Sequence, residues 1–202
     1  MKPLRRISLT VAAVALTAGC AGDPAINREA SVELAPMEKP AVLEGKLSWL
    51  DKGEPALMEI AMTGEGMVAG AWVEGTRKGC SWVNDSWFAP TLSWKDCEGS
   101  TGTQEATKSG DIWPLAVGMA ESYKVKGKNA KNETWQTTRR CEVSDMVMVS
   151  VQDKQYPSYE VICRDSWSTR TWYISPELKR TLKFKRVHNS RGVQSDMVAI
   201  LE

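Results

Sequence analysis

The sequence predicts a mainly β protein: an antiparallel sheet or half-closed barrel, disulfide-bonded, after a flexible N-terminal tether. Apolar and polar side chains alternate with a period of two in several short runs, most clearly at Val147, Val149 and Val151. This is the periodicity of a β-strand. Turn-forming residues separate the runs, as in Asn189-Ser190-Arg191-Gly192, which is typical of an antiparallel sheet. The second half of the chain shows no pattern of a long amphipathic helix.

The predicted strands follow in order. A hairpin is expected from residues 57–62 and 67–73, joined by Thr63-Gly64-Glu65-Gly66, and a further strand at 80–83. Residues 84–110 are rich in Asn, Asp, Ser, Gly and Thr, which favours a loop-rich segment closed by a disulfide. Later strands are expected near residues 122–126, 134–143, 146–151, 159–164, 169–174, 181–185 and 195–201.

The N-terminus has the pattern of a lipoprotein export signal. Lys2, Arg5 and Arg6 precede an uncharged, mostly apolar run over residues 7–18, which is too short for a transmembrane helix and indicates a cleaved signal. The stretch Leu16-Thr17-Ala18-Gly19-Cys20 resembles the bacterial lipobox. The resemblance implies that Cys20 carries fatty acyl chains such as palmitate and becomes the new N-terminus. By its similarity to enterobacterial sorting signals, Ala21 in place of Asp implies an outer-membrane lipoprotein facing the periplasm.

The predicted organisation has four parts: a signal peptide at residues 1–19, a lipidated tether at 20–42, a small disulfide-containing β/loop region at 43–110, and an antiparallel β-meander domain at 111–202. The tether contains Pro24, Pro36 and Pro40 and no sustained apolar period. A flexible chain of that length would span about 26 Å on average.

The charge balance argues against nucleic-acid binding. Removing residues 1–19 takes away three of the 26 Lys and Arg residues, which leaves 23 against 25 Asp and Glu. A nucleic-acid-binding protein normally has a strong basic excess.

Four cysteines remain after Cys20, and export to an oxidising compartment predicts that they pair. Four cysteines allow three pairings. We favour Cys80–Cys97 and Cys141–Cys163, because each pair flanks what reads as a local hairpin or meander. A four-cysteine metal site is the alternative, but the sequence has no C-x-x-C spacing, and we expect neither a metal nor a cofactor.

Two short motifs in the second half resemble segments of uncharacterised exported bacterial proteins. These motifs are Trp113-Pro114-Leu115-Ala116-Val117-Gly118 and Trp172-Tyr173-Ile174-Ser175-Pro176-Glu177-Leu178. The resemblance covers about residues 111–202 and implies an antiparallel meander between the motifs. This sequence departs from the pattern at Lys179, where the resemblance implies a glycine.

Aromatic residues are the strongest candidates for binding. Trp72, Trp82, Trp87, Trp94 and Trp113 crowd a span of about 40 residues. Indoles either pack a core or stack on a ligand such as a sugar ring. We select Trp87, Phe88 and Trp94 as the candidate binding residues, because they fall in the predicted loop, where exposed aromatics favour recognition.

Other constellations give no catalytic residue. His188 lies near Ser190 and Asp196, but no nucleophile elbow accompanies it. Carboxylates for glycosidase chemistry occur without a distinguishing context. A basic cluster is predicted to be a solvated strand face, with contact to anionic head groups as the alternative; its members are Lys179, Arg180, Lys183, Lys185, Arg186 and Arg191.

Three functions are therefore expected, in order of preference. The first is a non-catalytic binding or envelope-assembly module that is held at the membrane by its lipid anchor and contacts an envelope protein or glycan. The second is a lipid-handling half-barrel, and the third is an envelope hydrolase. A flat aromatic surface would favour the binding module, a dry apolar concavity would favour lipid handling, and convergent carboxylates in a cleft would favour hydrolysis.

Overall fold

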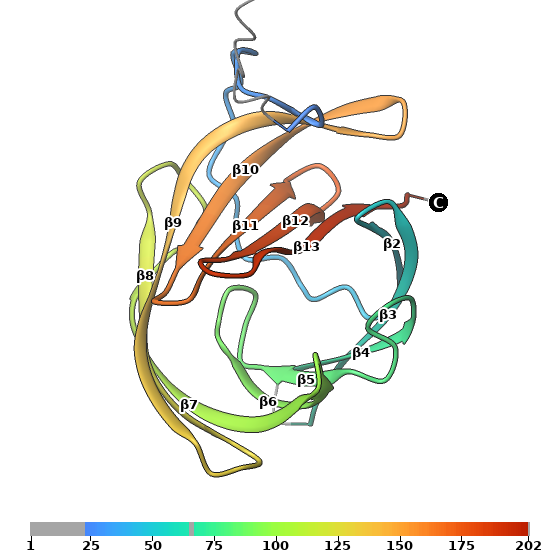
Figure 1. The fold of residues 1–202 in the computed structure, drawn as a ribbon. Coiled ribbons are helices and arrows are strands. Elements are labelled where there is room, and N and C mark those ends of the chain that lie inside the picture. The colour runs from blue at the N-terminus through green and yellow to red at the C-terminus, as the bar shows by residue number, and fades with distance from the viewer. Residues whose placement is uncertain (1–22, 65–66, 202) are drawn as a thin grey trace, which may run out of the picture.

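The computed structural model of the protein describes residues 23–64 and 67–201. Each strand from β2 to β13 pairs with the next along the chain, and β13 pairs with β2, so twelve strands form a closed antiparallel barrel (Figure 1). The sequence predicts an antiparallel sheet or a half-closed barrel. The antiparallel sheet is confirmed, but the barrel that it forms is closed. No helix in the described part of the chain is long and apolar enough to cross a membrane.

The described strands are β1 (Ile26–Asn27), β2 (Gly45–Asp51), β3 (Glu54–Met62), β4 (Val68–Glu74), β5 (Ser81–Asn84), β6 (Thr91–Cys97), β7 (Ser100–Asp111), β8 (Ala120–Asn129), β9 (Thr134–Val151), β10 (Lys154–Arg164), β11 (Ser168–Ser175), β12 (Arg180–His188) and β13 (Gly192–Ala199). Two-residue turns at Lys52-Gly53 and Glu98-Gly99 have positive φ at both positions, the geometry that fits the twist of a hairpin.

Much of the segment at residues 84–110 forms strands β6 and β7, which corrects the expected loop. The partly buried residues of β7 are Gly102, Gln104 and Ala106, and its alternate residues are exposed. None of these inner residues is a large apolar side chain, so the strand carries no hydrophobic alternation. Because β7 pairs with β8 along ten residues, the regions 43–110 and 111–202 are parts of one barrel rather than separate units.

Strand β9 is one continuous element of 18 residues, although the sequence suggests two strands. The pairing with β10 shifts so that Asp145 and Val143 face consecutive residues of β10, which leaves Ser144 as the extra residue of a β-bulge. Before the bulge, Val143 packs in the cluster inside the barrel. After it, Val147 and Val149 belong to a second cluster with Tyr173 and Leu182.

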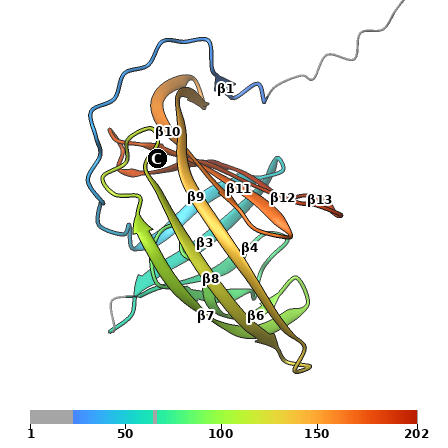
Figure 2. The same ribbon diagram turned by 90° about the vertical axis from the view of Figure 1, so that its left-hand side faces the viewer.

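Residues 23–37 contact the barrel, in contrast to the flexible tether that the sequence predicts. Strand β1 pairs with β9, the Asp23 carboxylate lies 3.0 Å from the Lys183 ammonium, and Arg28 forms an ion pair with Glu160. Met37 is buried and exchanges two backbone hydrogen bonds with Leu115. Figure 2 shows the segment between β1 and β2 looping around one end of the barrel. The signal peptide and Cys20 lie outside the described residues.

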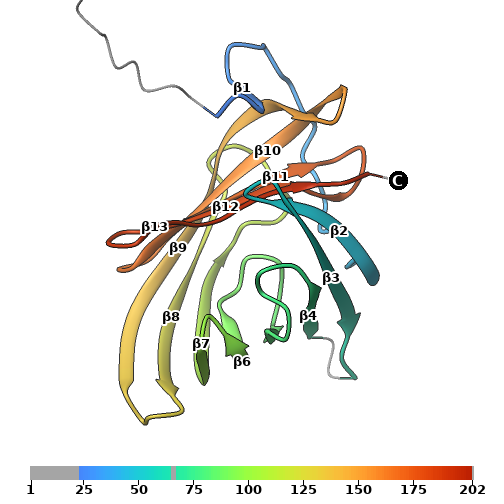
Figure 3. The same cartoon turned by 45° about the vertical axis from the view of Figure 1, so that its right-hand side comes forward.

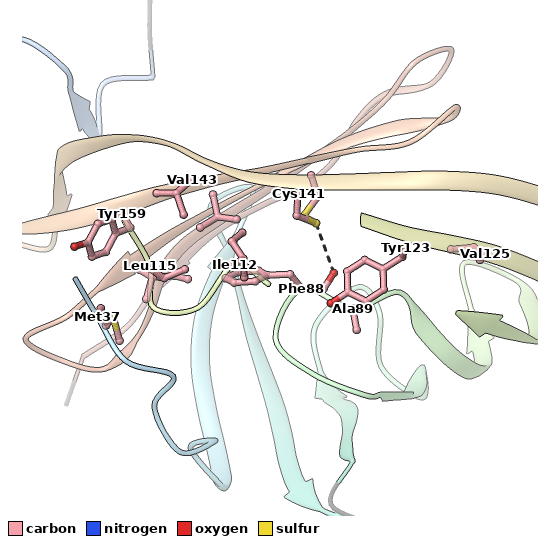
Figure 4. Packing of buried hydrophobic residues seen from close by; sticks show 13 residues of the cluster. Met37, Phe88, Ala89, Ile112, Leu115, Tyr123, Val125, Cys141, Val143 and Tyr159 are labelled. Carbon is pink, nitrogen blue, oxygen red and sulfur yellow. Dashed lines mark hydrogen bonds between the residues drawn. A yellow bond between two sulfur atoms is a disulfide. The ribbon is translucent and has the colours of Figure 1, made fainter. Parts of the chain in front are cut away.

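A compact apolar cluster fills one part of the barrel interior. The chain between β5 and β6 turns inward and places Phe88 beside Ile112 and Tyr123, while Leu115 and Tyr159 pack nearby (Figure 4). Phe88 is 1% exposed, and Ile112 and Leu115 are fully buried.

The two disulfides are the pairs that the sequence analysis favours. Cys80 is joined to Cys97, and Cys141 to Cys163. Cys141 and Cys163 are directly opposite each other on β9 and β10 and are fully buried. Each disulfide therefore belongs to one hairpin of consecutive strands: β5–β6 for Cys80–Cys97, where Cys80 directly precedes β5, and β9–β10 for Cys141–Cys163.

Candidate functional site

A cavity of about 730 Å³ lies inside the barrel, beside the apolar cluster. Inward-facing side chains from strands on all sides line it, together with residues of the connecting loops. Eight of the nine tryptophans in the sequence contribute to its wall; they are Trp49, Trp72, Trp82, Trp87, Trp94, Trp135, Trp167 and Trp172. This volume lies within the range of small-molecule binding sites.

Three of these indoles lie flat on the barrel wall, each over a glycine of the neighbouring strand. Trp82 is paired with Gly70, Trp94 with Gly102, and Trp135 with Gly127. A Cβ atom added to any of these glycines would come within 2.6 Å of the indole. Glycine is therefore needed for the close approach, and the arrangement holds each indole against the sheet in a fixed orientation.

The three candidate binding residues have different positions. Phe88 is buried and stacks on Trp113 at 5.7 Å between ring centroids, so it is a core residue and not the exposed loop aromatic that the sequence suggests. Trp87 is half-buried, meets Trp113 edge to face, and lines the cavity. Trp94 belongs to β6 and also lines the cavity, and its Nε1 donates to Ser100 Oγ at 3.0 Å.

Several buried polar atoms of the cavity wall have no hydrogen-bond partner among the described residues. They are Nε1 of Trp49, Nε1 of Trp87, Oδ1 of Asn84 and Nε of Arg186. Buried polar atoms in folded proteins are nearly always hydrogen-bonded. Three donors and one acceptor thus line the same cavity as the indoles, and a ligand with hydroxyl groups can satisfy both kinds.

Arginines gather at the side of the cavity near the turns that join β10 to β11 and β12 to β13. Arg139 and Arg170 both donate to Oδ2 of Asp165, at 3.2 and 2.6 Å. Arg186 donates to Glu98 at 3.2 Å. Burial raises the pKa of Asp165, but Arg170 and Arg139 outweigh it and hold that pKa at about 2. Burial and the repulsion from Arg170 lower the pKa of Arg139.

The basic cluster of the sequence is divided between two faces of β12. Lys183 is buried on the outer face, where it forms ion pairs with Asp23 and Asp196. Arg180, Arg186 and Arg191 instead line the cavity. The sequence predicts that these basic residues lie on a solvated strand face. The structure differs, because the N-terminal segment covers one face of β12 and the cavity lies on the other.

The His188 constellation does not assemble into a triad. Nδ1 of His188 lies 3.2 Å from Ser190 Oγ. The Asp196 carboxylate forms ion pairs with Lys183 and Lys185. Asp196 lies opposite Lys185 in the β12–β13 pair, and Lys185 is three residues from His188 along β12. Within residues 23–64 and 67–201, the side-chain contacts of Asp196 are thus with lysines.

The sequence analysis missed Trp135, Arg139 and Arg170 as cavity residues. The sequence does contain a signal for Trp135 and Arg139. Along β9, the less exposed residues Trp135, Thr137, Arg139 and Cys141 alternate with exposed residues. This period-2 pattern indicates a shared face. It does not reveal that the face points into a cavity, because that depends on closure of the barrel.

No protein-family model matches the sequence, and no curated protein matches it. Among solved structures, the fold is similar to that of the hypothetical lipoprotein YmcC from Escherichia coli, with a TM-score of 0.51 at 5% sequence identity. The similarity covers 84% of this chain and 90% of that chain. At this identity the similarity shows a shared fold.

Proposed function

We propose that this protein is a membrane-anchored lipoprotein whose barrel binds a glycan in its cavity without catalysing a reaction. The observation that carries the proposal is the combination of flat indoles and unpartnered polar atoms on one cavity wall. Sugar rings present apolar faces that stack on indoles. Their hydroxyls both donate and accept hydrogen bonds, so they match Trp49, Asn84 and Trp87.

This cavity wall is less suited to an acyl chain. A hydrocarbon would leave the Trp49, Asn84 and Trp87 polar atoms without partners, at a cost of about 1–3 kcal/mol each. It would also desolvate the arginines without offering them a counter-ion. Lipid handling inside the barrel is therefore the weaker candidate.

Hydrolysis is also a weaker candidate than glycan binding. Among the described residues, Glu98 and Asp165 are the carboxylates that line the cavity, and both are bound to arginines. A general acid in a glycosidase needs a raised pKa, whereas the pKa of Asp165 is held at about 2.

The lipobox and the name of the structural neighbour, a lipoprotein, support an acylated Cys20. In this proposal the barrel sits at the outer membrane and faces the periplasm. Cys20 is three positions before Asp23 in the sequence, with two residues between them, and Asp23 is ion-paired with Lys183 on β12. A chain of that length reaches at most about 11 Å, so the anchor would hold the barrel much closer to the membrane than a free tether. Figure 3 shows the β8–β9 turn at the opposite end of the molecule from β1.

Replacing Cys20 by serine tests the anchor. We expect Cys20→Ser to lose incorporation of labelled palmitate and to leave the membrane fraction after carbonate and salt washes. Ala21→Asp is the matched variant: it keeps the acylated cysteine and should move the protein from the outer to the inner membrane. Retention of Cys20→Ser in washed membranes would contradict lipidation.

Glycan binding is tested with an array of neutral and acidic bacterial oligosaccharides. We expect the purified barrel to bind members of the array, and Trp135→Ala and Trp167→Ala to weaken binding by about tenfold, or ~1.4 kcal/mol. Trp167 is 40% exposed, so its removal should leave the melting temperature nearly unchanged. Leu50→Ala is the control, since Leu50 is 38% exposed and does not line the cavity. An array without any bound oligosaccharide would contradict the proposal.

A further inference from the structure

We propose that Arg139, Arg170, Arg186 and Arg191 form an anion-binding subsite of the cavity, which recognises a carboxylate or phosphate group on the bound glycan. The assignment of the anion to a glycan rests on the proposed function above. The subsite itself rests on charge and geometry, and it is testable with a simple anion.

The first observation is a local excess of positive charge. The four arginines of the subsite face two carboxylates of the cavity lining, Glu98 and Asp165. A further lining arginine, Arg77, is balanced by its ion pair with Asp51. Two of the arginines, Arg139 and Arg170, share a single oxygen of Asp165. The chain without residues 1–19 has slightly more acidic than basic residues, so this excess is a property of the cavity and not of the whole protein.

The second observation is that the fold sets like charges against each other. Arg170 and Arg186 are directly opposite on β11 and β12, a placement that destabilises a sheet. Their side chains are 17% and 27% exposed. Nε of Arg186 is buried without a partner among the described residues. An anion bound between them would offset the repulsion and accept from the guanidinium forks, which match carboxylate and phosphate geometry.

A pair on the outer face shows why burial matters. Arg140 and Arg164 also share one carboxylate, Glu142, but their side chains are 63% and 57% exposed. Water screens such exposed charges, and their pairing has little energetic consequence. Arg139, Arg170 and Arg186 are much less exposed, at 9%, 17% and 27%, and lack most of this screening, so an unbalanced charge among them is costly unless an anion binds.

The third observation places the arginines beside the indoles. Trp135 and Arg139 are on the same face of β9, four residues or roughly 13 Å apart along the strand. Trp167 follows Asp165 in the β10–β11 turn, where its backbone N–H donates to Asp165 Oδ1 at 3.0 Å. An acidic oligosaccharide can therefore stack on an indole and place its charged group among the arginines.

Calorimetric titration of the whole barrel tests the subsite with three probes. Hexagalacturonate supplies carboxylates on a sugar chain, maltohexaose is its neutral counterpart, and inorganic pyrophosphate supplies phosphate without sugar. We expect hexagalacturonate to bind at least tenfold more tightly than maltohexaose at low salt. Arg186→Gln should remove that difference and weaken pyrophosphate binding by the same factor.

Two further variants keep the test decisive. Arg191→Gln changes an exposed side chain and should reduce anion affinity without affecting folding, which covers the case in which Arg186→Gln is unstable. Arg140→Gln removes an arginine from the outer face of β9 and should bind all three probes like the unmodified protein.

The outcomes separate the subsite from glycan binding. If both oligosaccharides bind equally and Arg186→Gln has no effect, the subsite is overturned while glycan binding stands. If pyrophosphate binds in an Arg186-dependent way and neither oligosaccharide binds, the anion subsite is supported and the glycan is not its source. Failure of all three probes to bind would overturn the inference.

Discussion

Phe88→Ala is expected to lower the free energy of unfolding by about 3–5 kcal/mol, the range for truncating a fully buried aromatic residue. The ring is 1% exposed and lies between Trp113 and Trp172, at 5.7 and 5.5 Å between centroids. Its removal leaves a void in the cluster beside the cavity. Urea unfolding at pH 7, followed by circular dichroism, measures the change.

Trp167→Ala is the control for this experiment. It removes a larger aromatic side chain, but one that is 40% exposed, and surface substitutions usually change stability by less than about 0.5 kcal/mol. A loss below about 1 kcal/mol for Phe88→Ala would contradict a core position for the loop between β5 and β6.

Replacing both Cys141 and Cys163 by alanine is expected to cost about 2–5 kcal/mol, the usual loss for a disulfide of a secreted domain. These cysteines are fully buried in the inner cluster, so the variant also loses packed sulfur atoms. The cost should therefore exceed that of the Cys80 and Cys97 double variant, because Cys97 is only partly buried. Urea unfolding of the two double variants measures the difference.

Loop length does not account for the expected difference between the two disulfides. Their cysteines are 22 and 17 residues apart, and in the chain-entropy model this changes the stabilisation by only about 0.2 kcal/mol. Equal losses in both double variants would show that packing around Cys141 and Cys163 adds nothing. Free thiols in the unmodified protein would contradict both pairings.

Strands with a buried face and an exposed face could be predicted from the sequence. Val147, Val149 and Val151 alternate with partly exposed residues, and the structure places them in β9. Strand β7 could not be predicted in this way. At its inner positions, Gly102 leaves room for the Trp94 indole, Gln104 lines the cavity, and Ala106 is a small residue against the apolar cluster, so no large apolar side chain marks the strand.

The cavity could be anticipated only in part. Trp87 and Trp94, which the sequence suggests as binding residues, do line it, whereas Phe88, adjacent to Trp87, is a core residue. The sequence places Arg139 and Arg170 31 residues apart, and no local pattern indicates that both reach Asp165. That contact requires β9, β10 and β11 to be neighbours with the observed register.

The sequence by itself determined what depends on neighbouring residues: the alternating strands, the turns between them, and the disulfide pairs, which join strands close along the chain. The tertiary structure decided what depends on strands far apart in sequence. Pairing of β13 with β2 closes the barrel, and closure turns one face of every strand inward. Only then do tryptophans and arginines from separate strands line one cavity. The physical reason is that side-chain periodicity records which residues share a face, whereas the space that this face encloses depends on the strand that completes the sheet.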